Sequence, residues 1–108
     1  YNDKMGWIRA KAAIRRLVKL CKSRGISLVL VNYPEMHNLK TYPFKTVNKK
    51  IKSLALEFNV HYLDLLPAVE GINESELWVS LTDQHPNGKA NILYAKAIHN
   101  FLAKSLFK

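Results

Sequence analysis

Ile26-Ser27-Leu28-Val29-Leu30-Val31 is a nearly continuous apolar run, and this stretch decides the fold. Such a run, β-branched in part, is typical of a strand that is covered on both faces within a parallel sheet. A second apolar run, residues 60–66, ends at Pro67. Because parallel strands need a long crossover connection, usually a helix, the helical pattern between the two runs predicts that they are parallel neighbours.

Three amphipathic helices are predicted around these strands from apolar residues at helical spacing. They cover about residues 7–24, 44–58 and 88–106. Gly25 and Asn59 suit the left-handed position that ends a helix, and Asn87 is a good N-cap. The order helix, strand, helix, strand, helix predicts an α/β fold in which parallel strands are flanked by helices. With 108 residues, the chain is expected to form one domain or a fragment of one, 1–108.

The charge of the chain is unevenly distributed. The net charge is +9, and 13 of the 17 basic residues lie between Lys4 and Lys52, whereas none lies between residues 53 and 88. We interpret the basic residues as solvated helix faces, because they are spread through helical patterns and are not clustered with aromatic residues. Contact with nucleic acid or an anionic membrane is the alternative. No apolar run approaches the ~20 residues of a membrane span. The single Cys21 is expected to be buried and inert.

Ser80-Leu81-Thr82-Asp83-Gln84-His85-Pro86-Asn87 brings a carboxylate and an imidazole together before the last helix. Pro86 disfavours helical backbone at His85, so we expect His85 on a loop just outside the helix N-terminus. An imidazole that a carboxylate orients can serve as a general base near neutral pH. Trp78, shortly before this stretch, is expected to fill the core rather than to line a pocket.

The same stretch resembles the C-terminal Asp-x-His-Pro-Asn motif of SGNH (GDSL-type) hydrolases. The matching residues are Asp83, His85, Pro86 and Asn87, with Ala90 and Ala95 where small residues recur. The resemblance implies a flavodoxin-like three-layer α/β/α domain, of which this chain is the C-terminal part, and a Ser-His-Asp site with His85 as general base. The family more often places the acid three residues before the histidine, where this chain has Thr82. The orienting group is therefore Asp83 or, alternatively, the Thr82 side chain or a backbone carbonyl.

The resemblance also implies that the nucleophile is missing from this chain. None of its serines lies in a Gly-Asp-Ser motif, which the family carries near the N-terminus of the full domain. We therefore expect the chain to be inactive alone, and the full protein to hydrolyse an ester, such as an O-acyl group on a carbohydrate or a lipid. The family's Gly-x-Asn-Asp block invites comparison with Asn2-Asp3, but we interpret these two residues as a cap of the first helix.

Polar residues follow the first predicted strand, where ligands bind in open α/β sheets. Tyr33, Glu35 and His37 are the candidates for substrate binding, with ordinary polar loop residues as the alternative for Glu35 and His37. Asp64, near the end of the second strand, is expected to bind loop N–H groups, with a role in the site as the alternative. No cofactor is expected. The histidines do not follow the spacing of metal ligands, so no metal site is expected either.

The apolar run at residues 26–31 predicts a partner for the chain, because a strand inside a sheet has neighbours on both edges. The chain supplies one neighbour, residues 60–66. We expect the other edge to bind the missing N-terminal half or, without it, a second copy of the chain. The alternative to the hydrolase is a small basic α/β module that binds a protein partner or a polyanion without catalysis.

Overall fold

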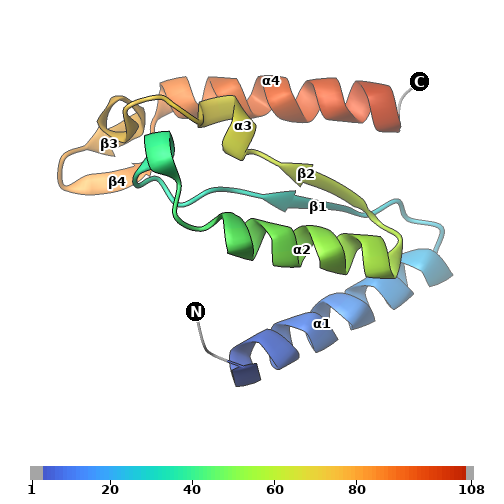
Figure 1. Cartoon of the computed structure of the whole chain (residues 1–108). Helices are drawn as coiled ribbons and strands as arrows, with labels where there is room; N and C mark the ends of the chain where they lie inside the picture. The colour runs from blue at the N-terminus through green and yellow to red at the C-terminus, as the bar shows by residue number, and fades with distance from the viewer. Residues whose placement is uncertain (1–3, 107–108) are drawn as a thin grey trace.

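A computed structural model of the chain describes residues 4–106, and the fold is mixed α/β (Figure 1). The elements, in order, are α1 (Lys4–Ser23), β1 (Val29–Asn32), the 3-10 helix η1 (Leu39–Thr41), α2 (Lys45–Phe58), β2 (His61–Asp64), α3 (Leu66–Val69), the 3-10 helix η2 (Glu74–Leu77), β3 (Trp78–Ser80), β4 (Asp83–Pro86) and α4 (Gly88–Ser105). The predicted cap at Asn2 or Asp3 lies outside the described residues.

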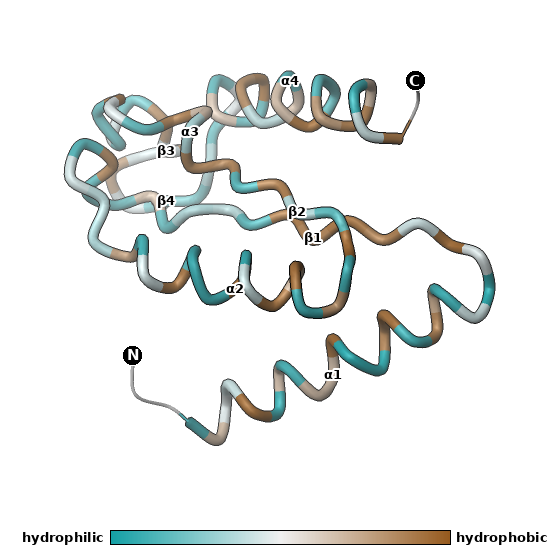
Figure 2. Tube along the Cα trace, turned by 45° about the vertical axis from the view of Figure 1, so that its right-hand side comes forward, coloured by the Kyte–Doolittle hydropathy of each residue, from teal (hydrophilic) through white to brown (hydrophobic). Residues whose placement is uncertain are grey.

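β1 and β2 form a parallel pair, which confirms the predicted pairing of the two apolar runs. Figures 1 and 2 show the pair between α2 and α4. Both strands are shorter than predicted. β2 ends at Asp64 because its Oδ1 accepts a hydrogen bond from the backbone N–H of Leu66, 2.9 Å away, and the chain then turns into α3. Asn48 of α2 also donates to the Asp64 carboxylate, so the predicted structural role of Asp64 is confirmed.

The predicted helix ends are confirmed. Gly25 and Asn59 both have left-handed backbone, with φ of 66° and 54°. After each, a backbone N–H reaches back into the helix, from Ile26 to the Cys21 carbonyl (2.9 Å) and from Val60 to the Ala55 carbonyl (3.0 Å). These bonds satisfy carbonyls that the end of a helix leaves unpaired. Cys21 itself is buried, as predicted.

The prediction of a loop at His85 is wrong. Asp83–Pro86 forms β4, which pairs antiparallel with β3, so that Trp78 lies opposite Pro86 and Ser80 opposite Asp83. The preference that Pro86 imposes on His85 is for extended backbone, which suits a strand as well as a loop. Only the pairing with β3, a contact between separate segments, distinguishes the two.

The hydrophobic core lies at the end of the molecule where β1 and β2 finish. Its buried residues are Met36, Leu39, Tyr42, Leu65, Leu66, Val69, Leu77, Ala90 and Tyr94. They join the segments that follow the two strands to the start of α4. α1 is peripheral to this core: only Val18 and Cys21 of α1 are buried, and its hydropathy alternates along the helix (Figure 2).

The described chain leaves more surface uncovered than a compact protein of its mass. Its accessible surface is 7594 Å² and its radius of gyration 15.4 Å. A compact monomer of this size exposes about 6,100 Å² and has a radius of gyration of about 13 Å. Part of the excess is apolar, because Leu17, Leu20, Val31 and Tyr33 are all exposed. This surface is available for another chain segment.

Candidate active site

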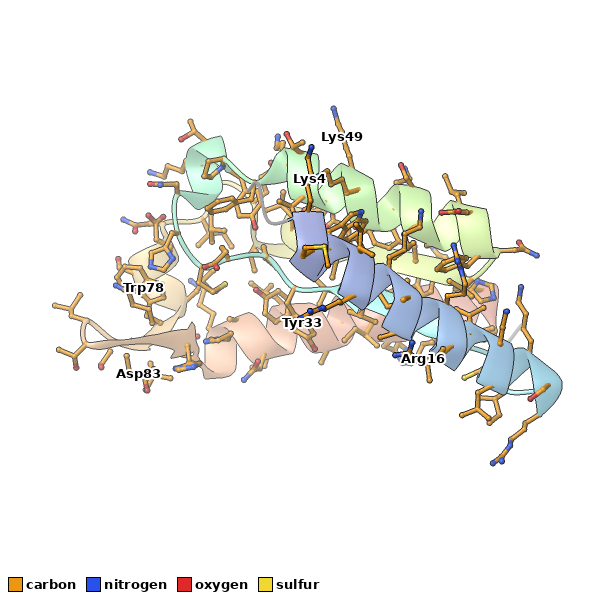
Figure 3. All side chains as sticks on the ribbon, turned by 90° about the horizontal axis from the view of Figure 1, so that it is seen from below. Lys4, Arg16, Tyr33, Lys49, Trp78 and Asp83 are labelled. Atoms are coloured by element: carbon orange, nitrogen blue, oxygen red, sulfur yellow. The ribbon has the colours of Figure 1, made fainter. Side chains whose placement is uncertain are left out.

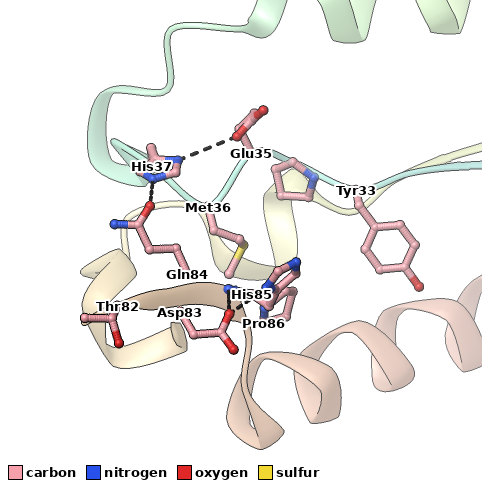
Figure 4. A pocket seen from close by; sticks show the side chains of 10 residues that line it. Tyr33, Glu35, Met36, His37, Thr82, Asp83, Gln84, His85 and Pro86 are labelled. Atoms are coloured by element: carbon pink, nitrogen blue, oxygen red, sulfur yellow. Dashed lines mark hydrogen bonds and ion pairs between the residues drawn. The ribbon is translucent and has the colours of Figure 1, made fainter. Parts of the chain in front are cut away.

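An open pocket of about 610 Å³ lies between the segment that follows β1 and strand β4 (Figure 4). Its lining residues are Tyr33, Pro34, Glu35, Met36, His37, Thr82, Asp83, Gln84, His85 and Pro86. All five site residues predicted from the sequence therefore line one pocket. The pocket lies beyond the carboxyl end of β1, where open α/β sheets bind their ligands.

Asp83 and His85 form a hydrogen-bonded pair at this pocket. The His85 Nδ1 lies 2.5 Å from Asp83 Oδ1, and the backbone N–H of His85 donates to the same oxygen at 3.2 Å. Because side chains alternate along a strand, residues two apart share a face, and the spacing of this pair suits extended backbone. The Thr82 hydroxyl pairs instead with Ser80 at 3.2 Å. Of the partners that the sequence left open for His85, Asp83 is the one that contacts the ring.

The environment of the pair keeps Asp83 ionised and the ring of His85 accessible. The hydrogen bond from the His85 ring, followed by the one from its backbone N–H, lowers the pKa of Asp83 below its usual range. The His85 side chain is 87% exposed. Among residues 4–106, its Nε2 has no hydrogen-bond partner. An ionised carboxylate on Nδ1 and an open Nε2 are the features that a general base needs.

His37, the second histidine of the pocket, is hydrogen-bonded at one ring nitrogen and lies beside a carboxylate at the other. Its Nε2 hydrogen-bonds to Gln84 Oε1, and its Nδ1 lies 3.6 Å from the Glu35 carboxylate. Gln84 projects from the face of β4 opposite to Asp83 and His85, and Figure 4 shows it reaching toward His37. These contacts make His37 a link between the two walls of the pocket, whereas His85 has a free nitrogen for proton transfer. The role of Gln84 had no signal in the sequence.

Buried and half-buried aromatic residues fix the wall opposite β4. The Trp78 Nε1–H donates to the Met36 carbonyl at 2.7 Å, and the Tyr94 hydroxyl donates to Met36 Sδ at 3.0 Å. The Tyr42 hydroxyl accepts from the Glu35 backbone N–H at 2.8 Å. Burial raises the pKa of Tyr42, and it raises that of Tyr94 to about 12, so both stay protonated at neutral pH. Trp78 packs against the core, as predicted, and does not line the pocket.

Tyr33 forms an exposed side of the pocket. Its ring meets that of Tyr94 edge to face, with centroids 5.1 Å apart, although 55% of the residue remains exposed. Glu35 is also exposed, so both residues present polar groups to a ligand. An aromatic face and a carboxylate beside an imidazole suit a small substrate that carries hydroxyl groups.

The wider features of the described part of the chain add two observations. Residues 4–106 hold no group of three or more His, Cys, Asp or Glu side chains arranged to bind a metal ion. None of the helices in this range has the length and apolar character needed to cross a bilayer.

Comparison with known proteins finds no match for the chain among protein-family models, curated proteins or solved structures. The functional assignment therefore rests on the geometry of the pocket.

The Asp83 carboxyl is expected to titrate below about 3.9, its unperturbed pKa, and to move back toward that value in His85→Ala. The side-chain hydrogen bond from His85 is the largest cause of the lowered pKa, and the backbone bond survives the substitution. A lowered pKa in the folded state also means that the contact stabilises the fold above the unfolded pKa and is lost as the pH falls. Carboxyl ¹³C NMR titration of the wild type and of His85→Ala measures the pKa of Asp83 in each.

His99→Ala is the matched control, because His99 is an exposed histidine on α4, away from the pocket. It should leave the Asp83 titration unchanged. An Asp83 pKa that is the same in wild type and in His85→Ala would show that the pair does not persist in solution.

Proposed function

We propose that Asp83 and His85 are the orienting acid and the general base of a serine ester hydrolase of the SGNH (GDSL) type. The observation that supports this is the 2.5 Å contact between Asp83 and His85 Nδ1, with Nε2 left open at a pocket beyond the end of β1. The general base of a serine hydrolase accepts the hydroxyl proton on one ring nitrogen, while a carboxylate hydrogen-bonded to the other nitrogen sets the tautomer. The arrangement of Asp83 and His85 suits this role.

In the proposed reaction His85 Nε2 accepts the proton of a serine hydroxyl as the serine oxygen bonds to the ester carbonyl carbon. Asp83 stabilises the imidazolium that forms. When the tetrahedral intermediate collapses, the ester C–O bond breaks and His85 returns the proton to the leaving alcohol. Water, deprotonated by the same nitrogen, then bonds to the carbonyl carbon of the acyl-serine. The bond from that carbon to the serine oxygen breaks, the acid leaves, and His85 returns the proton to the serine oxygen. Each step uses the same two side chains and needs no cofactor.

The nucleophile is proposed to come from a segment other than residues 4–106. No serine hydroxyl in this range hydrogen-bonds to His85, and Ser80, the serine nearest in sequence, pairs with Thr82. We place the serine and the oxyanion hole on a segment that pairs with the free edge of β1 and covers Leu17 and Leu20. That segment would extend the two-stranded parallel pair into the larger sheet of a flavodoxin-like domain, in which helices on both faces of the sheet give three α/β/α layers.

The size of the uncovered surface supports this placement. The excess exposed area of this chain, about 1,500 Å² over a compact monomer, exceeds the roughly 800 Å² that one partner contributes to a standard-size protein interface. The edge of β1 also presents unpaired backbone groups, which recruit further strands. A second copy of the chain would occupy the same surface where the nucleophile-bearing segment is absent.

The substrate is proposed to be an ester-bearing small molecule, with an O-acyl carbohydrate or a lipid as the two classes. Tyr33 would pack on the substrate, and Glu35 would accept hydrogen bonds from its hydroxyl groups. His37 would pair with Glu35 when its ring is protonated, because its Nδ1 lies 3.6 Å from that carboxylate. The pocket is wide and open, which suits an acyl group on a larger molecule.

Replacing the proposed base should abolish most of the activity. In a chain that carries residues 1–108 together with the nucleophile segment, we expect His85→Ala to lower kcat/KM for phenyl acetate by about a hundredfold to ten-thousandfold. The 108 residues alone should not label with a fluorophosphonate, which reacts with activated serines. His99→Ala is the control and should retain full activity. Wild-type turnover by a folded His85→Ala variant would rule out the role of His85.

The chain of 108 residues should associate when it is studied alone. We expect a dimer or a larger assembly at micromolar concentration by light scattering, because the edge of β1 and the side chains of Leu17 and Leu20 are exposed. Leu17→Lys with Leu20→Lys should weaken this association. Leu56→Lys is the matched control, because Leu56 is 73% exposed on α2. A stable monomer with a sharp thermal transition would contradict the proposal that a further segment covers this surface, and it would favour a self-sufficient binding module.

A further inference from the structure

The positive charge of the protein is concentrated on the face formed by α1 and α2. α1 carries seven Lys or Arg residues and no acidic one, and α2 carries four Lys and one Glu. The two helices therefore hold eleven cations against one carboxylate, a net charge of +10 in a chain whose total is +9. Figure 3 looks onto this face, with Lys4 and Arg16 on α1 and Lys49 on α2.

Most of these cations have no carboxylate partner. In the described part of the chain, the ion pairs of the two helices are Lys11 with Glu57 at 3.1 Å and Lys45 with Glu70 at 3.0 Å. The remaining cations on this face are Lys4, Arg9, Arg15, Arg16, Lys19, Lys22, Lys49, Lys50 and Lys52. An excess of unpaired charge of one sign attracts an anionic surface.

Two aliphatic side chains stand among the cations of α1. Met5 is 59% exposed and Ile8 is 57% exposed. At about 3.6 residues per turn, they share with Lys19 the side of the helix roughly opposite to Cys21, which is buried. Both side chains stay exposed beside α2. Ile8 lies roughly 120° to 180° around the helix from Leu20 and Leu17, so the segment proposed above to cover those two residues would leave Ile8 open. Exposed aliphatic groups within a basic face are the pattern of a helix that lies in a membrane interface.

We propose that the α1–α2 face binds peripherally to membranes that contain anionic phospholipids. The cations contact the phosphate and carboxylate groups of the lipids, while Met5 and Ile8 insert between the headgroups. A nucleic acid would also be attracted by the charge, but it offers no apolar region for two aliphatic side chains. The exposed Met5 and Ile8 therefore favour the lipid surface. This inference is independent of the proposed catalytic role of His85.

Vesicle co-sedimentation of the 108-residue chain tests the proposal. We expect binding to phosphatidylcholine vesicles that contain about 30% phosphatidylserine, no binding to pure phosphatidylcholine, and weaker binding as salt screens the charges. Each cation removed should weaken the partition by about fivefold. Arg16→Glu with Lys19→Glu should therefore lower it at least 20-fold, by about the product of two such steps. Lys96→Glu with Lys104→Glu on α4 makes the same change of charge elsewhere and should weaken binding much less.

A second pair of variants separates insertion from charge alone. Ile8→Ser should weaken the partition about tenfold, because an isoleucine side chain is no longer buried in the interface. Ile92→Ser is the matched control, because Ile92 is 59% exposed on α4. Equal binding to both kinds of vesicle would overturn the proposal. So would equal effects of the two Ile→Ser changes, or tighter binding to double-stranded DNA that Ile8→Ser leaves unchanged, because either result indicates a purely electrostatic polyanion surface.

Discussion

The side-chain amide of Asn87 holds the candidate site together. Its Oδ1 accepts the N–H of Ala90 at 3.0 Å and so begins α4, while its Nδ2 donates to the carbonyls of Glu76 and Trp78 at 2.9 and 3.0 Å. One side chain thus ties the first turn of the longest core helix to the strand that pairs with β4. His85 lies only two residues ahead of this anchor. An exposed imidazole therefore stands on backbone that is fixed, as a general base requires.

The other wall of the pocket is fixed through Met36. Trp78 binds its carbonyl and Tyr94 its sulfur, so the segment after β1 is attached to both β3 and α4. The two walls of the pocket are therefore held by Asn87 and Met36, both of which bind Trp78. Its chemistry then depends on one further contact, that of Asp83 with His85, which sets the nitrogen on which the ring accepts a proton. The basic α1–α2 face is separate from this network, so the proposed surface binding and the proposed catalysis would depend on different residues.

The features that the sequence predicted well are those that local chemistry decides. Gly25, Asn59 and Asn87 end or begin helices because of their own backbone and side-chain preferences, and the two apolar runs, joined through a helix, pair in parallel. All five candidate site residues lie in one pocket because β1 and the motif at Asp83 point to the same end of the molecule. Strand β4 was missed because the extended backbone that Pro86 favours at His85 suits a loop as well as a strand, and only the pairing with the neighbouring strand β3 decides between them. The contact between His37 and Gln84 was missed because the two residues are far apart in sequence.

The proton on the neutral His85 ring distinguishes a poised base from an exposed histidine that merely touches a carboxylate. Long-range ¹H–¹⁵N NMR spectra, recorded where the ring is neutral, measure it directly. If Asp83 orients the ring, His85 carries its proton on Nδ1 and has a bare Nε2, and Asp83→Ala returns it to the tautomer mixture of an unpaired imidazole. A wild-type His85 that carries its proton on Nε2 to the same extent as the Asp83→Ala variant would contradict the assignment of this pair as acid and base.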